Sequence, residues 1–230
     1  MVLGRHLTRL RRPHIRPVAR PSVRSAIVTT ARRLLHARGY GATSVDDLTR
    51  AAGVPKGSFY NYFASKEALA REVLRAYWAD AISSWEATPG TMPYARLVAH
   101  FHALTIATER FGLEAGCLIG NLGAEVGGGD SPLRDDLADV FSEWTDRIGE
   151  IVRDGQSCGE LPLDCDSVTL SRYLIAAWEG AVLRAKIERS SQSLLDFIAL
   201  LPRMAGLNTS PKETAHDLHS TSRVGRRSTR

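Results

Sequence analysis

Long apolar runs are missing from this 230-residue sequence. No segment approaches the roughly 20 apolar residues that a helix needs to cross a bilayer. The arginine-rich N-terminus has no apolar segment behind it, so we expect neither a membrane anchor nor a secretory signal. Cysteine is also scarce. The three cysteines, Cys117, Cys158 and Cys165, follow no metal-binding spacing, which favours free thiols in a reducing cytoplasm and no bound metal or other cofactor.

The usual signals of a catalytic site are absent as well. The segment GVPKGS at 53–58 does not match the phosphate-binding pattern GxxxxGK[ST], and no metal-ligand spacing occurs. Cys117 could act as a nucleophile, but no histidine lies beside it in the sequence, although folding could bring His100 or His102 near. We therefore expect no enzyme and assign no catalytic residue.

Acidic residues are missing from the first 24 positions, which hold seven arginines. Residues from 206 onward carry five basic and two acidic side chains, whereas 25–205 carry 18 basic and 23 acidic ones. A mildly acidic body with basic ends is common in DNA-binding proteins, because basic arms attract phosphate without reading sequence. A solvated, disordered arm without a role in DNA binding explains the first 21 residues equally well.

Helical periodicity dominates the rest of the chain, with no repeated alternation of the β type. The pattern predicts an all-α protein of about nine helices, in which a three-helix head at 22–64 joins a helical domain at 65–205. We expect disordered ends at 1–21 and 206–230. The predicted helices outside the head's central motif are 22–39, 65–85, 94–111, 114–126, 132–156, 165–188 and 193–204, with breaks at 88–93 and 127–132.

The central motif is Thr43–Phe63, TSVDDLTRAAGVPKGSFYNYF. Thr43 or Ser44 can cap a first helix, and Gly53 can end it because glycine adopts left-handed backbone geometry without strain. Pro55 then favours the first turn of a second helix. Two short helices joined in this way are typical of a helix-turn-helix, whose second helix enters the major groove of DNA.

The second helix of this motif carries side chains suited to DNA. Lys56 can contact phosphate or guanine, and Asn61 can bind adenine through two hydrogen bonds. Tyr60 and Tyr62 have an alternative, since either ring could pack into the core with its hydroxyl at the rim. Phe59 and Phe63, four residues apart, are expected to face inward.

The segment GVPKGSFYNYFASKEAL at 53–69 resembles the signature of the TetR family of bacterial transcriptional regulators. The resemblance covers about residues 22–204 and implies a homodimer that binds a DNA operator and a small-molecule effector. It also implies a set of DNA-contacting residues, in which the two lysines would contact phosphate. That set is Thr43, Ser44, Pro55, Lys56, Gly57, Ser58, Tyr60, Asn61, Tyr62 and Lys66. Lys66 could instead be a plain solvated charge.

Two further segments, GCLIGNLGAEV at 116–126 and WEGAVLRAKIERS at 178–190, resemble a TetR subgroup that responds to acrylate or to reactive electrophiles. That resemblance implies that Cys117 and Lys186 take part in sensing. A nearby ammonium would lower the pKa of the cysteine thiol and so favour its reactive thiolate. Cys117 could equally be an inert packing residue, and Lys186 a surface charge.

These observations predict a cytoplasmic, ligand-responsive repressor that binds a pseudo-palindromic operator on the bacterial nucleoid. Small residues on 165–188 favour a homodimer interface formed with 132–156, unless that face packs inside one subunit. A transcriptional activator and a non-specific DNA-architectural protein remain alternatives. The expected effector pocket is lined by Phe101, Leu104, Phe111, Cys117, Asn121, Trp144, Trp178, Glu179 and Lys186.

Overall fold

The computed structural model describes residues 22–83 and 92–206, and these contain nine α-helices and no β-strand. The all-α prediction is confirmed. The predicted basic arm, nearly all of the C-terminal tail and most of the break at 88–93 lie outside the described residues. The helices are α1 (Val23–Arg38), α2 (Val45–Ala52), α3 (Lys56–Tyr60), α4 (Lys66–Ser83), α5 (Pro93–Phe111), α6 (Leu118–Val126), α7 (Pro132–Ser157), α8 (Ser167–Glu188) and α9 (Gln192–Met204).

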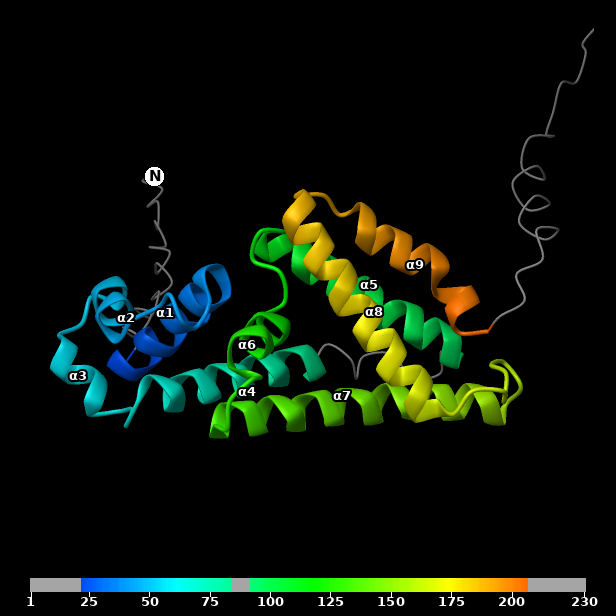
Figure 1. Cartoon of the computed structure of the whole chain (residues 1–230), viewed down its shortest axis with the longest axis horizontal. Coiled ribbons are helices and arrows are strands. Elements are labelled where there is room, and N and C mark those ends of the chain that lie inside the picture. The colour runs from blue at the N-terminus through cyan, green and yellow to red at the C-terminus, as the bar shows by residue number, and fades with distance from the viewer. Residues whose placement is uncertain (1–21, 84–91, 207–230) are drawn as a thin grey trace, which may run out of the picture.

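Helices α1 to α3 form a head at one end of the elongated molecule, and α5 and α7 to α9 form a bundle at the other (Figure 1). Helix α4 runs from the head toward the bundle and packs against both α1 and α7. The short helix α6 contacts α1, α4 and α7, so it lies where the head meets the bundle. One continuous hydrophobic core extends from Ile27 in α1 to Leu201 in α9.

Local sequence explains the head's helix boundaries. Ser22 caps α1, and its side-chain oxygen accepts a hydrogen bond from Ser25 N at 3.1 Å. Ser44 and Asp47 form a reciprocal capping box at the start of α2, a type of cap that contributes about 1 kcal/mol. Gly53 ends α2 in the left-handed conformation with φ of 67°. These three boundaries were predicted correctly.

Two predicted elements are shorter than expected. The helix predicted at 114–126 begins only at Leu118, because Gly116 adopts φ of 70° and a turn occupies the residues before it. The recognition helix α3 ends at Tyr60, so Asn61 and Tyr62 lie in the turn that follows rather than within the helix. In both places a local backbone turn interrupts an otherwise helical pattern.

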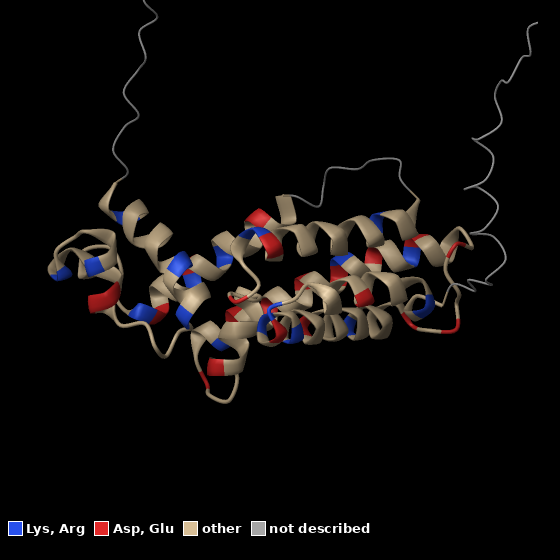
Figure 2. Cartoon of the chain, turned by 90° about the horizontal axis from the view of Figure 1, so that it is seen from above, with Lys and Arg blue, Asp and Glu red and all other residues tan. Residues whose placement is uncertain are grey.

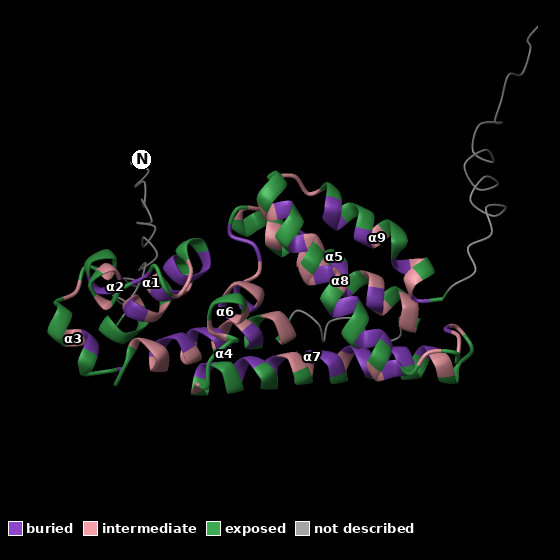
Figure 3. Cartoon of the chain, in the orientation of Figure 1, coloured by how far each residue is buried: buried purple, intermediate pink, exposed green. Residues whose placement is uncertain are grey.

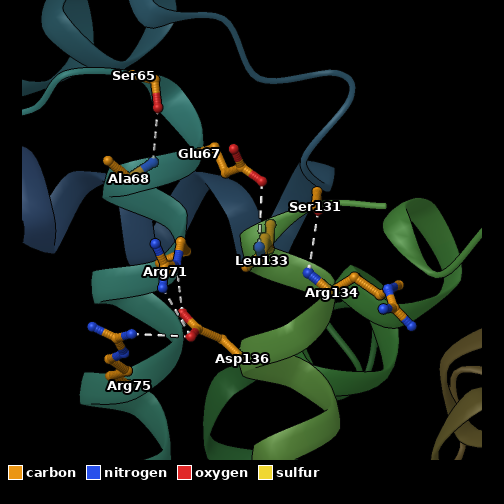
Figure 4. Close-up of polar contacts among 9 residues, drawn as sticks. All are labelled: Ser65, Glu67, Ala68, Arg71, Arg75, Ser131, Leu133, Arg134 and Asp136. Atoms are coloured by element: carbon orange, nitrogen blue, oxygen red, sulfur yellow. Dashed lines mark hydrogen bonds and ion pairs between the residues drawn. The ribbon is translucent and has the colours of Figure 1, made fainter. Parts of the chain in front are cut away.

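A polar cluster joins the start of α4 to the start of α7 (Figure 4). Arg71 Nε donates to Asp136 Oδ2 at 2.7 Å, and Arg75 Nη2 donates to Asp136 Oδ1 at 2.9 Å. One turn earlier, Glu67 Oε1 accepts from the backbone N of Leu133 at 3.3 Å. Because Asp136 is only 8% exposed, this cluster fixes α4 on α7 at a well-defined place and thereby sets the position of the head.

Acidic and basic residues are interspersed over the whole length of the described chain (Figure 2). Within the head, several cations already have acidic partners. Arg24 pairs with Glu72 and Arg32 with Asp80, so both link α1 to α4. Ion pairs of this exposed kind each contribute little to stability, about 0–1 kcal/mol. Their effect is to hold α1 in register along α4.

Candidate DNA-binding head and effector cavity

Helix α3 presents most of its surface to solvent at the far end of the head (Figure 3). Phe59 is fully buried and Phe63 is 4% exposed, so these two rings anchor the segment on the core as predicted. Tyr60 and Tyr62 are 57% and 45% exposed. The alternative in which either tyrosine packs into the core is therefore wrong, and both rings are free to meet a partner.

The predicted DNA-contacting residues differ in their availability. Lys56 is exposed, and its Nζ lies 2.8 Å from Asp46 Oδ1, so phosphate would have to replace this carboxylate. Lys66 is not a plain solvated charge, because its Nζ donates to Tyr40 O at 2.9 Å and lies 4.1 Å from the centre of the Tyr40 ring. Thr43 is fully buried, and its hydroxyl donates to Gly39 O at 2.7 Å. A hydroxyl contact from Thr43 to phosphate is therefore not available in this conformation.

The remaining predicted residues of the head lie at the surface. The hydroxyl of Ser44 is engaged with Asp47 in the helix cap, while its residue remains exposed. Gly57 has open space where a Cβ would stand, which permits close approach of a partner to the backbone. Pro55, Gly57 and Asn61 are exposed and Ser58 is half-buried. Exposed Arg50 on α2, which the sequence reasoning did not single out, adds a cation to the same head.

A cavity of about 270 Å³ lies between α6 and α8. Four predicted effector residues that are far apart in the sequence meet there: Cys117, Asn121, Glu179 and Lys186. The other lining residues are small or aliphatic, and they are Gly116, Gly120, Ala124, Gly180, Val182 and Leu183. Most of these were not predicted, although the glycines within 116–126 were a signal for close helix approach.

Glycines allow the charged groups of this cavity to approach α6. Lys186 Nζ donates to Asn121 Oδ1 at 3.0 Å, and the Lys186 stem passes 3.1 Å from where a Cβ on Gly116 would stand. A Cβ on Gly120 would lie 2.3 Å from Glu179 Oε2. Larger residues at these two positions would displace the lysine or the carboxylate. The sequence spacing alone did not reveal this packing.

Burial shifts the pKa values of two side chains that line this cavity, Glu179 and Cys117. It raises the pKa of Glu179 to about 7, and Glu179 Oε1 has no hydrogen-bond partner among the described residues. Burial, and then the negative charge of Glu179, raise the pKa of the Cys117 thiol well above its ordinary value. The sequence-based expectation of a lowered pKa at Cys117 is therefore wrong, first because the thiol is buried and then because its charged neighbour is the Glu179 carboxylate, while the Lys186 ammonium is bonded to Asn121.

A second, smaller cavity of about 40 Å³ lies on the bundle side of Cys117. Leu104, Trp144 and Trp178 line it as predicted for the effector pocket, and Tyr77 lines it without having been predicted. Phe101 and Phe111 line neither of these two cavities. Phe101 is fully buried and packs 4.7 Å from the Phe197 ring, while Phe111 is 50% exposed.

Within residues 22–83 and 92–206, no group of three or more His, Cys, Asp or Glu side chains is arranged to hold a metal ion. No helix in the same part of the chain is long and apolar enough to span a bilayer.

A three-helix head that exposes its short third helix, joined to a helical domain with a cavity between α6 and α8, is the arrangement of a helix-turn-helix transcriptional regulator. Residues 27–73 match the family of bacterial regulatory proteins called tetR, and 93–201 match a tetracyclin repressor-like C-terminal domain. HTH-type transcriptional repressor DhaR of a Mycobacterium species is 37% identical over 193 residues, which cover 80% of this chain and 96% of DhaR. The chain therefore belongs to the TetR family.

Other relatives agree with this assignment. Transcriptional regulator AcuR of Cereibacter sphaeroides is 36% identical over 70% of this chain and 74% of its own length. The crystal structure of regulatory protein TetR from Rhodobacter sphaeroides superposes with a TM-score of 0.73 at 33% identity, covering 78% of this chain and 96% of that one. Reduced NemR of Escherichia coli gives a TM-score of 0.70 at 26% identity, covering 82% of this chain and all of its own. This family and these relatives are transcriptional regulators rather than enzymes.

Proposed function

We propose that this protein is a ligand-responsive repressor, released from a pseudo-palindromic DNA operator when a small molecule binds between α6 and α8. The observation that carries the proposal is the cavity in which Cys117, Asn121, Glu179 and Lys186 meet. One wall of this cavity is α6, which also contacts α1 of the DNA-binding head. In this proposal residues 22–64 bind DNA, and residues 65–205 bind the effector and form a homodimer.

The proposed DNA contacts come from α3 and the turn after it. Lys56 contacts phosphate after leaving Asp46, while Tyr60, Asn61 and Tyr62 reach the base edges or the backbone of the major groove. Because one head reads one half-site, a dimer places two heads about 34–36 Å apart, one helical turn of DNA. This arrangement favours repression by occupancy of a short palindrome.

The proposed effector is a small, acrylate-like molecule. Lys186 supplies a cation for a carboxylate or carbonyl oxygen. Cys117 lines the cavity as a neutral thiol, since its raised pKa disfavours the thiolate that covalent capture needs. Reversible binding is therefore the proposed mode. A ligand of this kind releases DNA only if it binds the DNA-incompetent conformation more tightly.

The test begins with a duplex that the wild-type protein selects from a random DNA library. Lys56→Ala combined with Tyr60→Ala is expected to abolish binding to this duplex, while Glu150→Ala, an exposed carboxylate on α7, leaves it unchanged. Circular dichroism and sedimentation check that the double variant stays folded and dimeric. Unchanged binding by the double variant would show that the head assignment is wrong.

The effector is tested with sodium acrylate added to the protein–duplex complex. Wild-type protein is expected to release the duplex as acrylate is added, whereas the affinity of Lys186→Met for the duplex should be the same with and without acrylate. Footprinting of the same complex tests the architectural alternative, which predicts diffuse protection instead of one short palindrome. A reporter gene placed behind the duplex separates repression from activation by the sign of its response.

A further inference from the structure

A carboxylate from α6 holds the backbone loop at the exit of α1. The backbone N of Tyr40 donates to Glu125 Oε1 at 2.8 Å, and that of Gly41 donates to Glu125 Oε2 at 2.5 Å. Both oxygens of one side chain are therefore bonded to successive amides of the head. This paired contact joins the last turn of α6 to the loop that follows α1.

The two glycines of the loop sequence RGYGATS make room for this carboxylate. Gly39 has φ of 86°, and a Cβ there would lie 2.3 Å from Glu125 Oε1. A Cβ on Gly41 would lie 3.1 Å from Glu125 Oε2. The glycine-rich stretch therefore has two roles: it ends α1, and its lack of side chains leaves space for the Glu125 carboxylate.

The same loop fixes the start of two other helices of the head. Gly39 O accepts from the hydroxyl of Thr43, the residue before the cap of α2. Tyr40 O accepts from Lys66 Nζ at 2.9 Å, at the first residue of α4. A displacement of this loop would therefore move α2 and α4 relative to α1, and with them the recognition helix.

The other end of α6 is bonded to the effector cavity. Lys186 Nζ donates to Asn121 Oδ1 at 3.0 Å, and Asn121 Nδ2 donates to Ala115 O at 2.7 Å and to His36 O at 3.4 Å. Buried His36 in turn bonds through Nε2 to Gly116 O at 2.7 Å. Asn121 and Glu125 are four residues apart, so they lie on one face of α6. Asn121 bonds both to Lys186 of the cavity and to His36 of α1, and Glu125 bonds to the loop after α1.

We propose that Glu125 is the positioning residue through which the effector cavity controls the orientation of the DNA-binding head. Helix α6 carries the signal as a rigid element. A ligand that takes the ammonium of Lys186 away from Asn121 shifts α6, and Glu125 then moves or releases the Tyr40–Gly41 amides. This inference rests on the proposed function for its biological meaning, but the contact itself is testable without DNA.

The first experiment measures amide hydrogen exchange in the free protein. Glu125→Ala is expected to accelerate exchange at Tyr40 and Gly41, and Lys186→Met to accelerate it at the same two amides by about fivefold or more. Lys186→Met is expected to add nothing in the Glu125→Ala background. Wild-type protection in Lys186→Met, or additive effects of the two substitutions, would overturn the proposal.

The second experiment measures affinity for the duplex selected by the wild-type protein. Glu125→Ala is expected to lower this affinity by about fivefold or more. Glu125→Gln is expected to lower it by less, because the amide keeps one acceptor oxygen. Glu109→Ala, which removes an exposed carboxylate in the last turn of α5, should match wild type in both affinity and thermal midpoint. Wild-type affinity in Glu125→Ala would overturn the positioning role. If the wild-type protein selects no duplex, the proposed function fails, and the exchange experiment still decides the role of Glu125.

Discussion

At the scale of single residues, the cavity pairs a thiol with a carboxylate rather than with a cation. Cys117 and Glu179 are both affected chiefly by burial, which disfavours any charged form. Sequence spacing places Glu179 and Lys186 seven residues apart on α8 and so predicts a shared helix face. It does not say which of the two reaches Cys117. The tertiary approach of α6, permitted by Gly120, decides that the carboxylate does.

The raised pKa of Cys117 predicts slow alkylation. At pH 7, N-ethylmaleimide is expected to modify Cys117 at least about tenfold more slowly than exposed Cys158, which serves as the control within the same chain. Glu179→Gln removes the negative neighbour, lowers the pKa of the thiol and should speed modification of Cys117 alone. Mass spectrometry of peptides from timed samples gives both rates. Faster modification of Cys117 than of Cys158 would refute this and favour a covalent sensor.

At the scale of elements, two helices are joined by a buried charge. The two hydrogen bonds from Arg71, and then the one from Arg75, hold the pKa of Asp136 below its usual range. The sequence predicted α4 and α7 as helices from their apolar spacing. It did not predict their polar contact, because Arg71 and Asp136 are 65 residues apart and such pairs follow no local rule.

Asp136→Asn is expected to lower the free energy of unfolding at pH 7 by about 1–2 kcal/mol. This is a modest value because the side chains of Arg71 and Arg75 are 33% and 64% exposed. Since the folded pKa is depressed, the wild-type advantage is present above the unfolded pKa of about 3.9 and is lost as pH falls through the folded value.

Thermal unfolding of wild type and Asp136→Asn at pH 7 and at pH 3 measures this difference. The gap in Tm should be several degrees at pH 7 and narrower at pH 3. Asp139→Asn, an exposed aspartate three residues later on α7, is the matched control and should equal wild type at both values. A gap that does not depend on pH would mean that packing, not charge, explains the effect.

At the scale of the whole molecule, α8 carries an exposed stripe at the spacing of an interhelical seam. Its members are separated by three and four residues in turn, and they are Tyr173, Ala176, Gly180, Leu183 and Ile187. The small residues of α8 lie on two different faces of the helix. Ala185 is fully buried within the subunit, whereas Ala176 and Gly180 are exposed. Gly180 and Leu183 also line the effector cavity, so we propose that the homodimer interface lies directly beside it.

A charge on this stripe is expected to separate the subunits. Leu183 is 58% exposed, and Leu183→Glu should convert a dimer into a folded monomer and weaken operator binding at least about a hundredfold, because two linked heads bind far more tightly than one. Analytical ultracentrifugation gives the mass, and a binding titration gives the affinity. Leu163→Glu, at an 80% exposed residue off the stripe, should leave both unchanged. A dimeric Leu183→Glu protein would exclude this face as the interface.

The sequence by itself determined the parts of this protein that depend on local chemistry. Helical periodicity, the caps at Ser22 and Ser44 and the turn at Gly53 specify an all-α chain with a helix-turn-helix, because each acts within a few residues. Only the tertiary structure decided that Thr43 is buried, that Cys117 meets Glu179 and that Glu125 holds the loop at Tyr40. Those facts depend on burial and on contacts between residues tens of positions apart, which sequence periodicity does not encode.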